Sequence, residues 1–219
     1  MNIVIVSPHP DDETLGAAGT IIKYKSLGHK VYWINFTDVI DYDDWDKEFK
    51  EKRKKQIEDI CDYYEFDGFY NLGYKPAELD NISKKDMISK LSSIFQSIKP
   101  EWLILPDNND AHSDHKVVFE CCMACSKIFR YPYIKRIMTM EILSETDFGT
   151  NEHHFVANYF VDISDFIVNK IEALKIYDTE IAEPPFPRSI DRVKALSVVR
   201  GGIAGVKYAE AFRIIKFIE

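Results

Sequence analysis

The sequence predicts an α/β fold in which a mostly parallel β-sheet carries helices on both faces, giving three layers. Two continuous apolar runs, residues 3–6 and 102–105, lack the alternation of half-exposed strands and are typical of strands buried on both faces. Helical patterns separate these runs from each other and from further apolar segments. With 219 residues and 46% hydrophobic content, the chain is long enough for one core. We therefore expect a single Rossmann-like domain over residues 1–219.

Local signals define the expected elements in order. Pro8 and Pro10 end the first strand, because proline donates no ladder N–H and restricts the residue before it. Apolar spacing then predicts a helix that begins after Asp11 and ends near Leu27, followed by Gly28 as a cap. Further helices are expected over residues 47–64, 83–98, 114–129, 164–177 and 191–199. Further strands are expected over residues 31–36, 69–72 and 136–141, with an edge strand at 158–163.

Composition excludes several classes of function. A net charge of −8 disfavours a nucleic-acid partner, which needs a basic surface. The sequence has no apolar stretch long enough for a membrane span and no secretory signal before its first strand, so we expect a cytoplasmic protein. Cys122 and Cys125 have the spacing of half a zinc ribbon but no second pair, so they are expected to pack in the core as free thiols.

The first chemical cluster lies between the first strand and the first helix. His9, Asp11, Asp12 and Glu13 share this turn, and such turns lie at the carboxyl ends of strands, where ligands bind. Three carboxylates and an imidazole repel one another unless a positive charge lies among them. The helix N-terminus supplies part of that charge, and a divalent cation would supply the rest. An exposed acidic helix cap is the alternative interpretation.

The second cluster follows the fourth expected strand. His112 and His115 flank the start of a helix at the carboxyl end of that strand. If the two strands are neighbours, His9, Asp12 and His115 come together. Two imidazoles and one carboxylate are typical ligands of catalytic zinc. Each motif is weak evidence alone, but together they predict a metal site.

These residues resemble a known family. Two segments, Pro8-His9-Pro10-Asp11-Asp12-Glu13 and His112-Ser113-Asp114-His115, are similar to the paired motifs of the PIG-L/LmbE-type zinc-dependent N-deacetylases. The C-terminal segments 187–189, 200–201 and 205–212 resemble bacterial members. The resemblance implies hydrolysis of the N-acetyl group of an N-acetylglucosamine-type sugar derivative, releasing acetate and a free amine. A small acetylated amino sugar is then the expected partner, and a homo-oligomer is possible because relatives often form one.

The resemblance also implies roles for the residues of both motifs. His9, Asp12 and His115 would hold one Zn²⁺ per chain, which other divalent ions could replace. Asp11 would act as general base on the zinc-bound water. His112, protonated and oriented by Asp114, would stabilise the oxyanion and pass a proton to the leaving amine. Glu13 would support the turn by hydrogen bonding.

Substrate contacts are expected from three further residues. Arg53 is carried over from the family, although the glutamate that follows three residues later in many relatives is Gln56 here. Glu141, at the end of a strand, is expected to reach sugar hydroxyls. Arg188 is expected either to recognise an acidic aglycone or to form a buried ion pair. The acidic, aromatic segment 38–46 is interpreted as a loop over the site, either a moving lid or an ordinary loop, and His153 and His154 as solvated loop residues.

Two other functions remain open at this point. A phosphoesterase could use a similar set of ligands with two metals, and would need at least two further ligands at the site. A non-catalytic nucleotide binder is disfavoured, because Gly16 and Gly19 come too late after the first strand to form a dinucleotide-binding loop.

Overall fold

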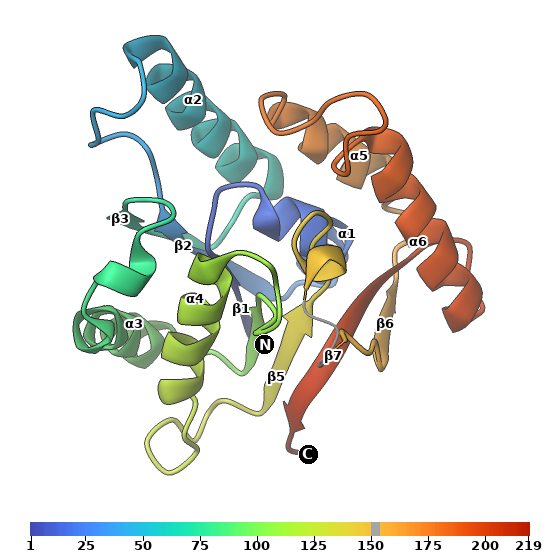
Figure 1. Cartoon of the computed structure of the whole chain (residues 1–219). Coiled ribbons are helices and arrows are strands. Elements are labelled where there is room, and N and C mark those ends of the chain that lie inside the picture. The colour runs from blue at the N-terminus through green and yellow to red at the C-terminus, as the bar shows by residue number, and fades with distance from the viewer. Residues whose placement is uncertain (150–153) are drawn as a thin grey trace.

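A computed structural model describes residues 1–149 and 154–219. In this part of the chain seven strands form one sheet, ordered β3-β2-β1-β4-β5-β7-β6 (Figure 1). The first five strands in this order are parallel, and β7 is antiparallel to both β5 and β6. The strands are β1 (Asn2–Ser7), β2 (Lys30–Thr37), β3 (Gly68–Tyr74), β4 (Trp102–Leu105), β5 (Arg136–Met140), β6 (Tyr159–Asp162) and β7 (Ala209–Phe217).

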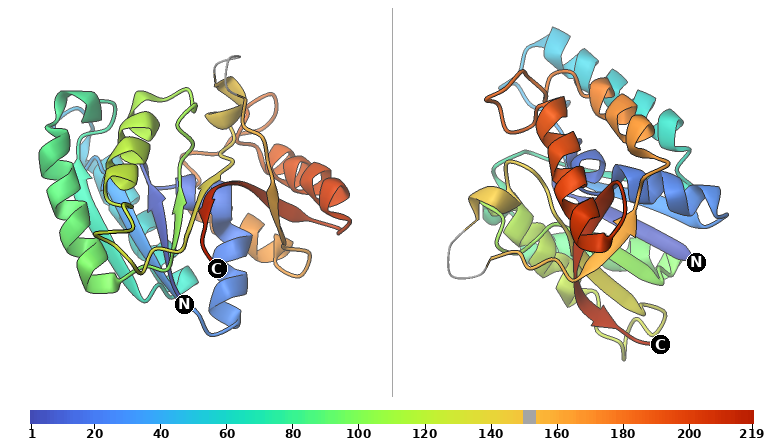
Figure 2. Two further views of the ribbon diagram at one scale, coloured as in Figure 1. Left: turned by 90° about the horizontal axis from the view of Figure 1, so that it is seen from below. Right: turned by 90° about the vertical axis from the view of Figure 1, so that its right-hand side faces the viewer.

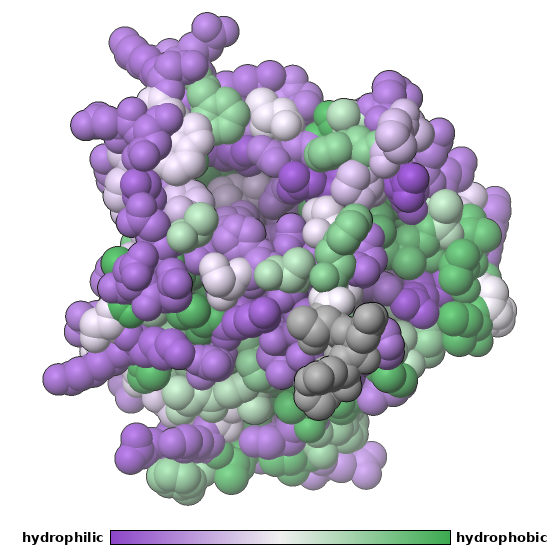
Figure 3. Space-filling view, in the orientation of Figure 1, coloured by the Kyte–Doolittle hydropathy of each residue, from purple (hydrophilic) through white to green (hydrophobic). Residues whose placement is uncertain are grey.

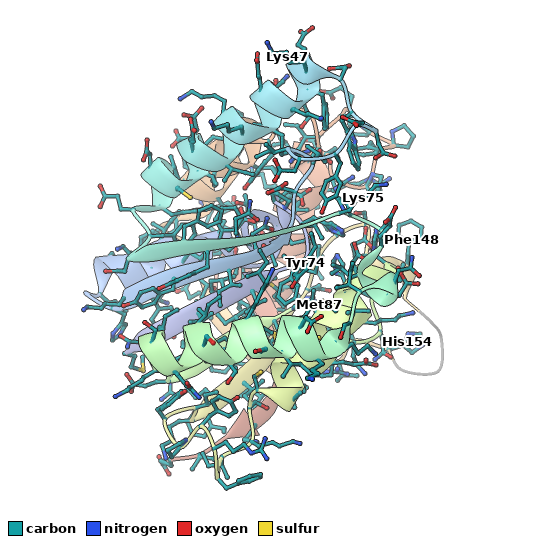
Figure 4. All side chains as sticks on the ribbon, turned by 90° about the vertical axis from the view of Figure 1, so that its left-hand side faces the viewer. Lys47, Tyr74, Lys75, Met87, Phe148 and His154 are labelled. Carbon is teal, nitrogen blue, oxygen red and sulfur yellow. The ribbon has the colours of Figure 1, made fainter. Side chains whose placement is uncertain are left out.

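Helices cover both faces of the sheet, as the two views in Figure 2 show. One core joins the sheet to α1 (Asp12–Ser26), α2 (Lys47–Tyr64), α5 (Ile167–Ile176) and α6 (Ile190–Ala204). The other core joins it to α3 (Lys84–Ile98) and α4 (Ser113–Ala124). Met87 of α3, labelled in Figure 4, is completely buried in this second core. The predicted three-layer α/β fold is therefore confirmed.

The strand order places the two sequence motifs next to each other. β1 pairs with β2 on one side and with β4 on the other. Strands after β1 therefore extend the sheet first to one side of β1 and then to the other. The turns after β1 and β4 therefore lie side by side at the carboxyl edge, the usual ligand position in an open α/β sheet. Lys75 and Phe148, from segments after β3 and β5, lie on the same side of the molecule in Figure 4. The expected adjacency of β1 and β4 in the sheet is confirmed.

Some predicted helices differ in extent, and one strand was not predicted. The helix expected over residues 191–199 spans Ile190–Ala204. The helix expected to reach residue 129 ends at Ala124, where the Ser126 hydroxyl donates to the carbonyl of Met123 and the chain turns away. β7 was not predicted, although it extends the sheet beyond β5 and carries the edge strand β6. The expected edge position of the segment around residue 160 is confirmed.

Three shorter findings complete the fold. The 3-10 helices Leu79–Asn81 and Thr146–Phe148 follow β3 and β5 respectively. No helix in residues 1–149 or 154–219 is both long and apolar enough to cross a bilayer. His153 lies outside the described residues, and its neighbour His154 is exposed.

Candidate metal centre and active site

The β1–α1 turn holds its backbone in an unusual conformation. Asp11 has φ 139° and ψ −27°, a region that non-glycine residues rarely adopt. Such strain costs about 1–3 kcal/mol and persists only where neighbouring contacts enforce it. The N–H and the hydroxyl of Thr37 both donate to the Pro8 carbonyl, and Arg53 donates from Nη1 to the Pro10 carbonyl at 3.0 Å. The turn is thus fixed from β2 and α2.

Three potential metal ligands meet between the two turns. Asp12 Oδ2 lies 3.4 Å from His115 Nε2 and 3.6 Å from His9 Nδ1, and these three atoms lie within 4.8 Å of one another. His115 is fully buried, and its Nε2 has no hydrogen-bond partner. An unpartnered buried nitrogen is costly, and a divalent cation would satisfy it. The group therefore fits a metal ion with two nitrogen ligands and one oxygen ligand.

The far nitrogen of each ligand histidine is held by a carboxylate. His115 Nδ1 donates to Asp110 Oδ2 at 2.8 Å, and His9 Nε2 donates to Asp114 Oδ2 at 3.1 Å. These bonds leave His115 Nε2 and His9 Nδ1 as the lone-pair nitrogens, both facing Asp12. Carboxylate support of this kind orients the ring and raises its basicity toward a metal. Asp110 was not predicted as a site residue.

Electrostatics also favour a cation at this point. Burial lowers the pKa of His9, but hydrogen bonds and charge from Asp114 and Asp12 outweigh it and raise the pKa to about 10. Burial raises the pKa of Asp12, but His115 and His9 outweigh it and lower the pKa to about 2. The raised pKa of His9 reports the negative charge around it, and the lowered pKa of Asp12 reports its attraction to the imidazoles, so both favour positive charge next to Asp12.

The expectation that the Asp114 carboxylate orients His112 was wrong. That carboxylate instead accepts from His9 and from the backbone N–H groups of Ala77 and Leu79, at 2.7 and 3.2 Å. His112 Nδ1 accepts from the backbone N–H of Asp114 at 3.1 Å, which leaves Nε2 to carry the proton of a neutral ring. Burial and the nearby His9 lower the pKa of His112, which opposes the protonated ring expected from the sequence.

A second possible ligand group shares His9 with the first. His9, His112 and Asp114 also bring one ligand atom each within 4.8 Å. In this group His9 Nε2, both carboxylate oxygens of Asp114 and His112 Nδ1 already have hydrogen-bond partners. The first group contains His115 Nε2, a buried nitrogen without a hydrogen-bond partner, and the second group contains no such atom. The first group is therefore the stronger metal site.

Asp11 faces the arginine that was expected to contact substrate. Arg188 Nη1 donates to Asp11 Oδ2 at 2.9 Å and lies 3.5 Å from Glu180 Oε2. Burial and the neighbouring Asp12 raise the pKa of Asp11 well above its usual range, against the opposing charge of Arg188. Of the two alternatives for Arg188, the structure shows an ion pair.

Arg53 also has an acidic partner. Its Nη2 forms an ion pair with Glu180, and the side chain is buried. Gln56 donates to Asp178 Oδ1 at 2.9 Å. Glu180 thus supplies the charge next to Arg53 that the glutamine cannot. Neither Asp178 nor Glu180 was identified from the sequence, because both lie in a loop far along the chain.

Glu13 lies beneath the turn, fully buried. It accepts from the Asp11 N–H at 3.1 Å, from the Thr14 hydroxyl at 2.7 Å and from the Tyr177 hydroxyl at 2.9 Å. Burial outweighs these hydrogen bonds and raises the pKa of Glu13 to about 7. Its contacts connect the first turn of α1 to the end of α5.

A cavity of about 280 Å³ opens onto His9 and Asp12, which with His115 are called the metal group below. Figure 3 shows a hollow below α2, bordered mainly by hydrophilic residues. Val39 and Trp45 of the 38–46 loop, with Phe49 of α2, form part of its wall. The other lining residues are His9, Pro10, Asp11, Asp12, Thr37, Asp38, Arg53, Pro76, His112, Glu145, Glu180 and Arg188.

Two other sequence expectations have clear outcomes. Glu141 does not line this cavity; its carboxylate pairs with Arg200, with Oε2 accepting from Nε at 2.8 Å. Cys121, Cys122 and Cys125 are free and buried, as expected for core thiols. Glu145, from the segment after β5, lines the cavity without having been predicted.

Comparison with known proteins agrees with this fold. Over 97% of its length the chain is 21% identical to a diacetylchitobiose deacetylase of Thermococcus kodakarensis, of which it covers 82%. The fold is shared with an N,N'-diacetylchitobiose deacetylase of Pyrococcus horikoshii, with TM-score 0.76, 23% identity and coverage of 98% and 84% of the two chains. It is also shared with the 4-carboxy-2-hydroxymuconate hydratase GalB of Pseudomonas putida, with TM-score 0.77, 13% identity and coverage of 98% and 95%. Residues 4–126 match the family described as PIG-L, GlcNAc-PI de-N-acetylase, and the chain belongs to this family.

Proposed function

We propose that this protein is a zinc-dependent hydrolase that removes the N-acetyl group from an N-acetylglucosamine-type sugar derivative. The single observation that carries the proposal is the meeting of His9 Nδ1, Asp12 Oδ2 and the unpartnered, buried His115 Nε2 beside an open cavity. Two relatives described as diacetylchitobiose deacetylases support the choice of substrate. Acetate and a free amine are the products.

The metal would be held by His9, Asp12 and His115. A zinc ion in such a site supplies Lewis acidity, which polarises a carbonyl and makes water nucleophilic at neutral pH. The remaining chemistry belongs to the side chains of this chain. Asp110 and Asp114 fix the two imidazoles, so the ligand geometry is set before substrate arrives.

Asp11 is suited to act as general base. Arg188 holds Oδ2 of its carboxylate, while the side chain lines the cavity next to Asp12. Oδ1 is then the oxygen that would take the proton from the attacking water and return it to the departing amine nitrogen as the C–N bond breaks. Fixing one carboxylate oxygen also reduces the entropy lost in reaching the reactive geometry.

His112 is suited to the opposite role, as hydrogen-bond donor. Because Nδ1 accepts from the Asp114 N–H, the proton of the neutral ring lies on Nε2. The ring lines the cavity 4.5 Å, centroid to centroid, from His9. Nε2–H can donate to the acetamide oxygen as negative charge develops there, and a donor in this position typically lowers the barrier by a few kcal/mol.

The test separates amide hydrolysis from the other chemistries. Metal-loaded protein is incubated with N-acetylglucosamine, N,N'-diacetylchitobiose and a matched set of phosphate esters, and acetate and free amine are measured together. We expect equal amounts of acetate and amine, loss of activity with a strong chelator and recovery with Zn²⁺. Hydrolysis of the phosphate esters with untouched acetamides would establish a phosphoesterase instead. The hydratase GalB shares this fold, so the fold alone does not decide the reaction.

A further inference from the structure

We propose that the cavity selects uncharged or amine-bearing N-acetylated saccharides and rejects those whose aglycone carries a carboxylate or a phosphate. This inference rests on the proposed deacetylase function and narrows its substrate class. It follows from the charges in the cavity wall, and in particular from which of those charges are already paired.

Both guanidinium groups in the described part of the wall already have carboxylate partners. Arg53 donates to the Pro10 carbonyl and to Glu180, and only about 8% of its side chain is exposed. Arg188 Nη1 is paired with Asp11 and Glu180, whereas its buried Nε has no hydrogen-bond partner. The positive charge of both groups is thus already balanced by Asp11 and Glu180, and an anionic aglycone would have to compete with these carboxylates for it. Recognition of a phosphate or carboxylate usually depends on free, bidentate guanidinium donors.

The wall also contains carboxylates without a cationic partner. Asp38 and Glu145 line the cavity, and no residue within 1–149 or 154–219 forms an ion pair with either. Asp38 is 5% exposed and accepts hydrogen bonds from the Ile40 N–H and the Asn71 amide. Glu145 is half-buried, and the Ser144 hydroxyl lies 3.4 Å from its Oε1. Arg53 and Arg188 balance Asp11 and Glu180, and a bound divalent cation would balance Asp12 and one further carboxylate. Asp38 and Glu145 therefore still leave the wall with an excess of negative charge.

The surroundings of the cavity extend the same charge pattern. Lys75, next to the lining residue Pro76, is engaged by Asp44 at 3.1 Å and by Glu78 at 2.8 Å. The 38–46 loop carries further aspartates, and the whole chain has a net charge of −8. An approaching anion is therefore repelled at the entrance as well as within the cavity.

The apolar part of the wall suits a sugar ring. Trp45 and Phe49 line the cavity and are half-buried, and aromatic faces offer large contact area at little conformational cost. The Arg53 guanidinium lies 5.6 Å from the centre of the Phe49 ring, so the aromatic wall is itself fixed. An uncharged pyranose can bind there without losing the hydration of a charged group.

The experiment compares two sugars that differ by one charge. N,N'-diacetylchitobionic acid and the corresponding alditol, N,N'-diacetylchitobiitol, both have an open-chain reducing-end residue and share both acetamides, and only the acid carries a carboxylate. We expect kcat/KM for acetate release to be roughly tenfold or more higher for the neutral sugar, because like charges several ångströms apart repel strongly near a protein surface. The penalty should decrease with added salt. The disaccharide with one free amine should show no such penalty.

Glu145→Gln tests whether this wall causes the selectivity. It removes one charge and keeps the shape, so the ratio of the two kcat/KM values should fall severalfold. Glu58→Gln is the matched control, since Glu58 is exposed on α2 and does not line the cavity; it should leave the ratio unchanged. An equal or higher kcat/KM for the acid, or a penalty insensitive to both salt and Glu145→Gln, would overturn the inference.

Failure of the proposed function has a different outcome. If neither sugar releases acetate, deacetylation of this substrate class is wrong, and the substrate class inferred here falls with it. Calorimetric binding of both sugars to the metal-loaded wild-type protein checks the charge selectivity without turnover. Tighter binding of the neutral sugar supports the inference, and tighter binding of the acid overturns it.

Discussion

Two buried charged clusters contact α1, and they differ in how completely their polar groups are paired. Glu210 accepts from the Gly19 N–H, from the N–H and hydroxyl of Thr20, and from Lys170 Nζ at 2.7 Å. Lys170 also donates to the Leu15 carbonyl. At the first turn of the same helix, the metal group has an unpartnered His115 Nε2 and crowded carboxylates.

The difference separates a structural cluster from a functional one. A buried charge is tolerated when it is paired and hydrogen-bonded, and the Lys170–Glu210 cluster meets this condition within the protein. The cluster around Asp12 meets it only with a positive charge from outside. The two clusters should therefore respond in opposite ways to substitution, one through the free energy of unfolding and the other through metal binding and turnover.

Loss of the carboxylate ligand should have the largest effect. Asp12→Ala leaves two imidazoles without their shared oxygen ligand, so bound zinc and acetate release should both disappear. Elemental analysis and an acetate assay on one preparation measure the two quantities. A variant that keeps one zinc per chain would show that Asp12 is not a ligand.

Loss of the proposed base should affect turnover alone. Asp11→Asn keeps the shape of the side chain and its contact with Arg188 while removing basicity, so acetate release should fall by on the order of 10²–10⁴-fold. Zinc content should stay at the wild-type level. A zinc-free Asp11→Asn protein beside a zinc-loaded Asp12→Ala protein would reverse the two assignments.

The paired cluster should respond in stability. Lys170→Met leaves Glu210 buried without its cation, which should cost about 3–5 kcal/mol of unfolding free energy. Denaturant unfolding of metal-loaded protein measures this cost. The double variant Lys170→Met/Glu210→Gln should recover part of it. The idea that this cluster is structural fails if the single variant unfolds like wild type but binds less zinc.

The smallest effect is expected from the carboxylates behind the histidines. Asp110→Asn and Asp114→Asn should each weaken zinc affinity by roughly 10–100-fold, because each removes the charge that orients one ligand imidazole. Competition with a chelator of known affinity measures the change. Equal zinc affinity in both variants and wild type would show that this support is unimportant here.

The sequence predicted the parts of the site that depend on local signals and on strand adjacency. Apolar runs identified β1 and β4, and their parallel pairing was sufficient to bring His9, Asp12 and His115 together. The limits of α2, residues 47–64, were also predicted correctly, because its apolar face is regular.

The sequence did not predict contacts made by side chains from distant loops. Glu180 reaches Arg53 and Arg188 from a segment whose pattern gives no sign of the site. Asp110 stands among several similar polar residues, and only the fold shows which one meets His115. Asp114 was expected to orient His112, its neighbour in the sequence, whereas the tertiary structure brings its carboxylate to His9. Glu141 was expected at the sugar because it lies at the end of a strand, but its carboxylate pairs with Arg200.

The most direct test of the metal centre is a zinc titration of metal-free protein, followed by calorimetry and by acetate release on the same samples. We predict one zinc per chain, recovery of deacetylation in proportion to the zinc bound, and no such binding by His115→Ala. Full acetate release by protein that contains no metal, or undiminished zinc binding by His115→Ala, would contradict the account.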